Sequence, residues 1–139
     1  LHLLLGNAYR ASGDNARAAP AYARTVALAP DMAGAWRNLG LAQLGTNRAA
    51  EASVTLRHAC ALEPDSAANW NSLGAALHAT GAVDAALCAF TEAGRCGAVG
   101  TSEGNRARWN ESLLRLLTGD MARGWVLHEF RRDGPAGAR

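Results

Sequence analysis

The sequence contains no lysine, and all fourteen of its basic residues are arginine. This absence excludes any mechanism that depends on lysine, such as a Schiff base or the phosphate-binding lysine of a P-loop. The sequence also lacks any apolar run close to the roughly 18 residues that a membrane-spanning helix needs. We therefore expect no membrane insertion. The net charge is only +2, so composition gives no reason to expect nucleic acid as a partner.

Cysteines are few as well: Cys60, Cys88 and Cys96 are the three present, and no two of them form a C-x-x-C pair. An odd number of cysteines argues against a disulfide framework, so reduced thiols in a cytoplasmic protein are the simplest interpretation. The chain starts at Leu1 rather than at methionine, and we hypothesise that further sequence precedes it.

Aromatic residues make up only 6% of the chain, whereas 49% is hydrophobic and much of that is alanine. Alanine-rich sequences with few β-branched residues favour helices over sheets. A length of 139 residues corresponds to one domain or to a fragment of a larger protein. The composition therefore predicts an all-α chain.

An internal repeat of constant period organises the chain. The segment AWRNLG at 35–40 recurs as NWNSLG at 69–74. The same offset relates alanines, large residues, glycines and prolines, namely Ala18, Ala52 and Ala86; Tyr22, Leu56 and Phe90; Gly6, Gly40 and Gly74; and Pro30 and Pro64. Agreement of so many positions on one period is typical of repeat architectures, in which neighbouring units stack on one another.

These positions resemble the tetratricopeptide repeat, whose pattern is W-x2-L-G-x2-Y, then A-x3-F, then A and P. The second unit matches it with Trp36, Leu39, Gly40, Ala52, Leu56, Ala59 and Pro64. His2 replaces the tryptophan of the first unit, and Ala98 replaces the proline of the third. The resemblance implies an all-α, right-handed superhelical α-solenoid of about four antiparallel helix pairs.

We expect the units at 1–32 (N-terminally incomplete), 33–66, 67–100 with a glycine-rich end, and 101–131, followed by a tail at 132–139. Apolar residues spaced at i, i+3, i+4 and i+7 predict the helix pairs 2–12 with 15–28, 33–45 with 48–61, and 67–79 with 82–94. Small residues, Gly40 with Ala52 and Gly74 with Ala86, are expected to let the paired helices approach closely. Gly13, Asn47 and Gly81 are predicted to make the turn within each pair.

The period breaks after the third unit. We expect the glycine-rich segment 94–104 to be a connector, because the turn glycine that follows Gly81 is Gly119, later than the period would place it. A divergent fourth pair is predicted at about 105–117 and 121–131. The sequence TGDMARGWVLHEF at 118–130 contains His128 and Glu129, but the second histidine of an H-E-x-x-H zinc motif is absent. This segment is therefore predicted to pack rather than to carry chemistry.

No group of residues predicts a metal, a cofactor or catalysis, so this fragment is not expected to be an enzyme. The histidines His2, His58, His78 and His128 have no spacing that implies shared ligation. His58 and Cys60 lie two positions apart on a predicted helix and so point to different faces. The cysteines are expected to be small buried apolar residues rather than nucleophiles. Cys96 is an exception, because the adjacent Arg95 is expected to favour its thiolate.

The resemblance implies that a ligand binds on the concave face, which the first helix of each unit lines. The implied groove residues are Asn7, Arg10, Arg37, Asn38, Leu41, Asn71, Ser72, His78, Arg106, Trp109 and Asn110. Amide side chains can hydrogen-bond the backbone of an extended peptide, and arginine favours carboxylate or phosphate. The leading interpretation is a protein–protein interaction scaffold that binds a peptide or protein segment in this groove.

Two subtypes of the family can be compared by position. The chaperone-binding subtype clamps a C-terminal carboxylate with cations and two asparagines; Asn7 and Asn38 match, but the cation positions hold Leu3, Ala68 and Ser72. We therefore do not expect this clamp. The asparagine ladder of O-linked N-acetylglucosamine transferases is matched in part by Asn38 and Asn110, a match that generic surface composition explains equally well.

The segment 109–132 resembles the closing segment of bacterial proteins in which such repeats precede a glycosyltransferase-like domain. The matching residues are Asn110, Leu113, Gly119, Gly124, Trp125, Glu129 and Arg131. This resemblance implies an alternative function, a substrate-recognition or oligomerisation arm of a larger bacterial glycosyltransferase-like enzyme. A third hypothesis is self-association through the array ends, because the first helix begins with an apolar stacking face.

Overall fold

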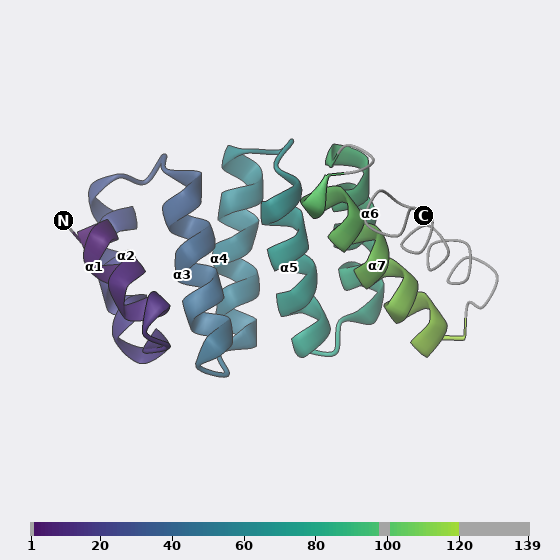
Figure 1. Cartoon of the computed structure of the whole chain (residues 1–139), viewed down its shortest axis with the longest axis horizontal. Helices are drawn as coiled ribbons and strands as arrows, with labels where there is room; N and C mark the ends of the chain where they lie inside the picture. Colours follow the sequence, from purple (N-terminus) through teal and green to yellow (C-terminus); the bar gives the residue numbers. More distant parts are fainter. Residues whose placement is uncertain (1, 98–100, 120–139) are drawn as a thin grey trace, which may run out of the picture. The chain divides into compact units, whose positions relative to one another are not determined.

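The computed structural model describes residues 2–97 and 101–119. These residues form seven α-helices and no β-strand (Figure 1). The helices are α1 (His2–Ala11), α2 (Asn15–Leu28), α3 (Ala33–Gly45), α4 (Ala49–Leu62), α5 (Ala67–Ala79), α6 (Val83–Cys96) and α7 (Ser102–Leu117). The predicted all-α class is confirmed. The second helix of the predicted fourth pair, with Gly124, Trp125, His128 and Glu129, and the tail 132–139 lie outside the described residues.

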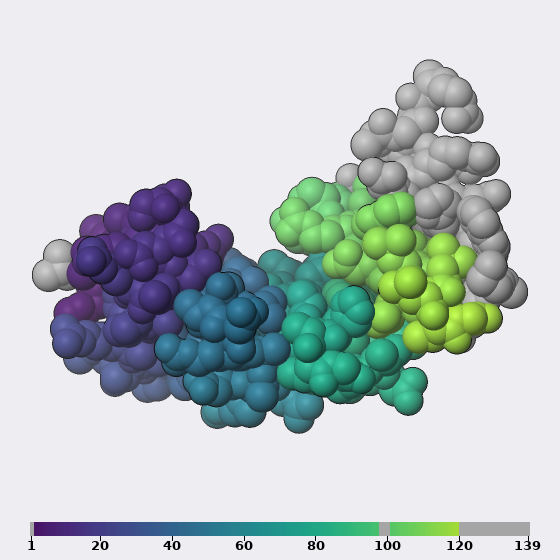
Figure 2. All heavy atoms as spheres, turned by 90° about the horizontal axis from the view of Figure 1, so that it is seen from below, coloured from purple at the N-terminus to yellow at the C-terminus, as the bar shows by residue number. Residues whose placement is uncertain are grey.

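The chain divides into two compact units, Leu1–Pro64 and Asp65–Arg139. In the first unit α1 pairs with α2, α3 pairs with α4, and α2 packs on α3. The space-filling view shows these two helix pairs, purple and blue, in continuous contact (Figure 2). In the second unit α5 pairs with α6, and α7 packs on both. The boundaries of the repeats themselves stay a prediction from the sequence.

A residue with positive φ makes the turn within each helix pair. The φ angles are 83° at Gly13, 63° at Asn47 and 84° at Gly81, and Gly119 after α7 has a φ of 90°. Glycine and asparagine adopt this left-handed conformation at the lowest cost among the common residues. The prediction of these turn residues is confirmed.

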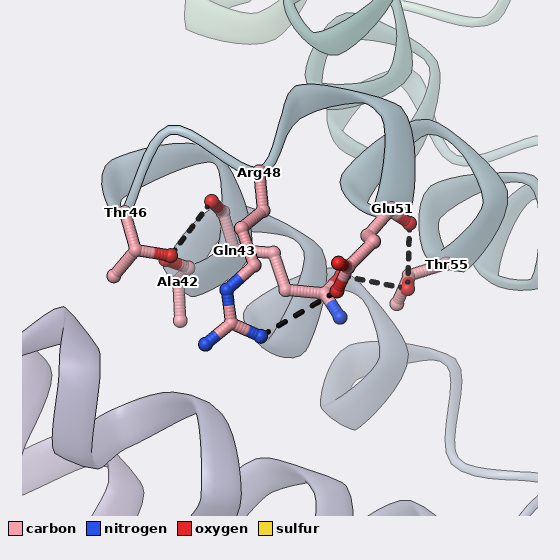
Figure 3. Close-up of polar contacts among 6 residues, drawn as sticks. All are labelled: Ala42, Gln43, Thr46, Arg48, Glu51 and Thr55. Atoms are coloured by element: carbon pink, nitrogen blue, oxygen red, sulfur yellow. Dashed lines mark hydrogen bonds and ion pairs between the residues drawn. The ribbon is translucent and has the colours of Figure 1, made fainter.

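Polar side chains support the turn between α3 and α4 (Figure 3). The Oγ1 atom of Thr55 donates to Oε1 of Gln43 at 2.7 Å, which joins α4 to α3. Oγ1 of Thr46 lies 3.0 Å from the carbonyl oxygen of Gln43, and Arg48 and Glu51 form an exposed ion pair at 3.4 Å. Because these contacts bracket Asn47, they help to hold its left-handed backbone.

The core of the first unit joins α2 to α3. Its buried residues are Ala18, Ala19, Tyr22, Val26, Ala35, Leu39 and Ala42, and the partly buried Leu3, Tyr9 and Trp36 pack against them. Removal of this apolar surface from water is the main source of stability in such a stack, at about 25 cal/mol per Å². Side chains of α2, in the first helix pair, thus cover the apolar face of α3 in the next pair.

Glycines of the first helices lie against large residues of the paired helices. A Cβ atom on Gly40 would lie 2.5 Å from Cγ of Leu56. Gly6 has the same relation to Tyr22, with a distance of 2.7 Å to Cε1. Each glycine therefore makes room for a large residue of the paired helix, because that side chain lies against the position that a Cβ atom would occupy.

The connector between α6 and α7 is shorter than the predicted segment 94–104. Helix α6 continues to Cys96, and α7 begins at Ser102 rather than near residue 105. The hydroxyl of Thr101 accepts a hydrogen bond from the Gly104 backbone N–H, which starts α7 early. A Cβ atom on Gly97 would lie 2.6 Å from Cα of Gly104. These two glycines therefore serve a close backbone contact rather than a long loop.

Candidate functional site

The first helices of the pairs carry the predicted groove residues, and each unit presents its own set. In the first unit, Asn7 and Arg10 lie on α1, and Arg37, Asn38 and Leu41 lie on α3. Two hydrogen bonds order three of these side chains. Nη1 of Arg10 donates to Oδ1 of Asn38 at 2.9 Å, and the Tyr22 hydroxyl donates to Oδ1 of Asn7 at 2.7 Å. The structure thus brings Arg10 and Asn38 together from two successive helix pairs.

The two hydrogen bonds determine which atoms face a ligand. The amide oxygens of Asn7 and Asn38 each accept a bond from within the unit, so the hydrogen-bonding groups that these bonds leave open are mainly donors, the two NH₂ groups and the remaining N–H groups of Arg10. We call Asn7, Arg10 and Asn38 the donor surface. Neither α1 nor α3 contains an aspartate or a glutamate. The donor surface therefore suits a ligand that offers hydrogen-bond acceptors, and carboxylates above all.

In the second unit, one of the predicted groove residues is buried. Asn71 is buried, with 6% exposure, and its Nδ2 donates to the backbone oxygen of Glu103 in α7 at 3.1 Å. Helix α7 starts earlier than expected and covers this side chain, so the predicted groove residue has little exposed surface. Ser72 is half-buried, and its Oγ donates to the Ala68 oxygen at 2.9 Å. Asn71 and Ser72 therefore do not give the second unit exposed amide NH₂ groups like those of Asn7 and Asn38 in the first unit.

His78 and Asn110 instead border an apolar cleft within the second unit. Its volume is about 220 Å³, and its lining residues come from α5, α6 and α7: Ala75, His78, Phe90, Asn110, Leu113, Leu114 and Leu117. Leu113 and Leu117 are exposed. Of the other predicted residues on α7, Arg106 is exposed and Trp109 is half-buried. The cleft has room for a large apolar side chain.

Sequence reasoning missed the contribution of Tyr22. This residue is fully buried and was identified only as a large residue of the repeat, yet its hydroxyl orients Asn7. A signal was present, because the equivalent positions hold Leu56 and Phe90, which have no hydroxyl. Arg108 was missed as well; its Nη2 donates to the Gly94 oxygen at 2.8 Å and ties α7 to α6.

The described residues contain no group of three or more histidine, cysteine or acidic side chains placed to hold a metal ion. His58 stacks on Trp36, with ring centroids 4.7 Å apart, and so has a packing contact. None of the helices in the described segments is long and apolar enough to cross a membrane.

Cys96 differs from its predicted state. It is the last residue of α6, and burial raises the pKa of its thiol by more than the positive charge of Arg95 lowers it. Arg95 itself is paired with Glu92, with Nη2 and Oε2 2.9 Å apart. The expectation of a favoured thiolate was wrong, because the arginine charge is shared with a carboxylate while the thiol is desolvated.

The described helices form antiparallel pairs, the fold of an α-solenoid. A model of the tetratricopeptide repeat family matches residues 3–53. A comparison with curated proteins gives no match.

Several solved structures share this fold. A crystal structure of MamA is 21% identical, with a TM-score of 0.84, over 96% of this chain and 75% of that one. MamA from Desulfovibrio magneticus RS-1, from residue 41 to the end, is 19% identical, with a TM-score of 0.81, over 95% of this chain and 75% of that one. The Sgt2 TPR domain from Aspergillus fumigatus is 19% identical, with a TM-score of 0.77, over 89% and 81% of the two chains. At these identities the likeness establishes the solenoid fold.

The link to glycosyltransferase-like proteins stays a prediction. Of the residues that carry it, Gly124, Trp125, Glu129 and Arg131 lie outside the described part of the chain.

Proposed function

We propose that this chain is a protein-interaction scaffold that binds an extended peptide or protein segment along the first helices of its pairs. The donor surface of the first unit carries this proposal. Framework packing does not require Arg10 and Asn38 to be joined, because both side chains project from the core and neither belongs to the buried cluster. Their hydrogen bond instead holds two ligand-binding groups in fixed positions, which lowers the entropy lost on binding.

The chemistry of an extended segment complements the donor surface. Its backbone carbonyl groups are acceptors that asparagine NH₂ groups can bind without regard to sequence. Arg10 adds a preference for a carboxylate, with which a guanidinium forms charge-assisted hydrogen bonds. The helices α1, α3 and α5 contain no acidic residue that would compete for these contacts or repel such a ligand. We therefore infer that the bound segment is acidic or neutral.

The second unit has a candidate binding surface of its own, of a different chemical kind. Its cleft of about 220 Å³ is mostly apolar, with His78 and Asn110 as polar lining residues. A leucine or aromatic side chain of a ligand would fit within this volume, and burial of such a side chain contributes about 1.5–3 kcal/mol. Apolar anchors of this kind dominate the affinity of many interfaces.

Site-specific photo-crosslinking tests the proposal even though the partner is unidentified. A photo-reactive phenylalanine analogue is placed at Leu41 on α3, in the predicted groove, or at Val54 on α4, which is 60% exposed. We expect crosslinked partners from position 41 and not from the matched control at position 54. Crosslinks to the same partners from both positions, or from position 54 alone, would contradict binding on the first helices.

A further inference from the structure

The side chain of Tyr22 connects the core of the first unit to the donor surface. Tyr22 is fully buried, and its ring lies against α1 where Gly6 has no side chain. A Cβ atom on Gly6 would lie 2.7 Å from Cε1 and 3.1 Å from Cζ of Tyr22. The hydroxyl group on Cζ donates to Oδ1 of Asn7, the exposed residue that follows Gly6, at 2.7 Å. A core side chain thus ends at a residue of the predicted groove.

The internal repeat indicates that this hydroxyl group is not part of the framework. Phe90, two periods after Tyr22, packs against a first-helix glycine in the same way without a hydroxyl group. The equivalent positions of the second and third pairs hold neither the hydroxyl nor the amide: they are Leu56 with Leu41, and Phe90 with Ala75. Among these three pairs, the hydroxyl of Tyr22 and the amide of Asn7 therefore occur together in the first.

The bond between them determines which end of the Asn7 amide faces outward. A buried hydroxyl proton needs an acceptor, because leaving it unpaired costs the desolvation of the group. Oδ1 of Asn7 is the acceptor that the structure supplies, and the NH₂ group of the same amide has no partner among the described residues. Asn38 is held in the same sense, since its Oδ1 accepts from Arg10. Both amides therefore present donors.

We propose that Tyr22 is a positioning residue of the donor surface: its hydroxyl group holds the Asn7 amide with NH₂ outward, so that this amide binds hydrogen-bond acceptors. The inference rests on the proposed function, because it concerns the segment that Asn7, Arg10 and Asn38 bind. An amide free to rotate would also turn its oxygen toward the ligand, where the oxygen repels a carboxylate. It would lose rotational freedom on binding as well, a cost that the bond from Tyr22 removes in advance.

Binding of a synthetic acidic peptide tests the inference on the full chain. The probe is a short fluorescein-labelled peptide in which glutamate alternates with threonine, a composition that favours an extended chain rich in acceptors. Fluorescence anisotropy measures its affinity. We expect Tyr22→Phe to weaken binding about three- to tenfold, the effect of about one hydrogen bond.

Tyr9→Phe is the matched control for the loss of a hydroxyl group. Tyr9 is a half-buried tyrosine of α1, and its hydroxyl makes no hydrogen bond to the residues that the structure describes. We expect this variant to bind the probe as tightly as the intact chain does. Circular dichroism confirms that each variant is folded.

A double-mutant cycle separates positioning from a general effect on the fold. In an Asn7→Ala background the hydroxyl of Tyr22 has no amide to hold, so Tyr22→Phe should cause no further loss of affinity. Asn7→Asp gives a second test that leaves Tyr22 intact. Its carboxylate keeps an acceptor for the hydroxyl but replaces the outward NH₂ with an oxygen, so the probe should bind at least about tenfold more weakly.

The motion of the Asn7 side chain gives a readout that needs no ligand. Nuclear magnetic resonance relaxation measures the order parameter of its amide ¹⁵N. We expect this order parameter to fall in Tyr22→Phe, where nothing holds the amide oxygen, and to be unchanged in Tyr9→Phe.

The outcomes distinguish failure of this inference from failure of the proposed function. If Arg10→Ala with Asn38→Ala weakens the probe but Tyr22→Phe does not, the role of Tyr22 is refuted and the proposed function stands. An equal loss from Tyr22→Phe with and without Asn7, an unchanged order parameter, or unchanged affinity of Asn7→Asp would also overturn the inference. No binding of the probe, or binding that Arg10→Ala with Asn38→Ala leaves unchanged, would refute the proposed function and this inference with it.

Discussion

Phe90 occupies the space into which a side chain at position 74 would extend. A Cβ atom on Gly74 would lie 2.5 Å from Cε1 and 2.6 Å from Cδ1 of Phe90. Phe90 is itself buried, with 4% exposure. Gly6 with Tyr22 and Gly40 with Leu56 have the same relation. This contact sets how closely the two helices of each pair approach.

Replacing Gly74 should therefore destabilise the second unit. We expect Gly74→Leu to lower the free energy of unfolding by about 1–3 kcal/mol or more, because the helices must separate to admit the side chain. Urea unfolding followed by circular dichroism measures the change. Gly34→Ala is the matched control, since nothing lies within 4 Å of a Cβ atom there and alanine favours the helix. Equal effects of the two substitutions would refute the steric explanation.

The turn at Asn47 offers a test of backbone conformation alone. Its φ of 63° is unfavourable for residues with a Cβ atom, and asparagine is among the exceptions. We expect Asn47→Ala to lower the free energy of unfolding by about 1 kcal/mol and Asn47→Gly to leave it nearly unchanged. Thermal and urea unfolding of both variants measure the difference. A greater loss with glycine than with alanine would show that the side chain, not the backbone, decides stability here.

Cys96 should be a slow nucleophile near neutral pH. Burial raises the pKa of its thiol, so less thiolate is present at a given pH than in a free cysteine. We expect the rate of alkylation by iodoacetamide, resolved by mass spectrometry, to be lower than for an unstructured cysteine peptide. The rate should keep rising with pH in the range where that of the peptide has levelled. In urea the two rates should converge; a faster reaction of native Cys96 than of the peptide near neutral pH would contradict the account.

The sequence predicts most of the fold because the repeat framework is local. The period of the repeat and the turn residues Gly13, Asn47 and Gly81 place each helix to within a few positions. The start of α7 was placed too late, because its early beginning depends on the Thr101 cap and on the contact between Gly97 and Gly104. Neither contact belongs to the repeat pattern.

The candidate site is less predictable from the sequence, because it too depends on contacts that do not belong to the repeat pattern. Position in the repeat identified Arg10 and Asn38 separately, but their hydrogen bond depends on how two helix pairs stack. Asn71 has the right residue type on a first helix, yet α7 packs over it. The orientation of Asn7 depends on the hydroxyl of Tyr22, a core residue. Framework positions thus predict where a binding residue lies, whereas its accessible atoms depend on its neighbours in space.

The most direct test of the proposed function uses a partner captured by crosslinking at Leu41. Isothermal titration calorimetry then compares the intact chain with Arg10→Ala together with Asn38→Ala, which removes two members of the donor surface, and with Arg57→Ala as the control. Both sets of side chains lie outside the buried core, so we expect the melting temperature to stay within a few degrees, since surface substitutions change stability by about 0.5 kcal/mol or less.

We predict that the double variant binds the partner at least about tenfold more weakly, because a hydrogen bond to a charged group contributes about 1.5–3 kcal/mol. Arg57→Ala should bind as tightly as the intact chain. Unchanged affinity of the folded double variant would contradict the assignment of the donor surface as the binding site.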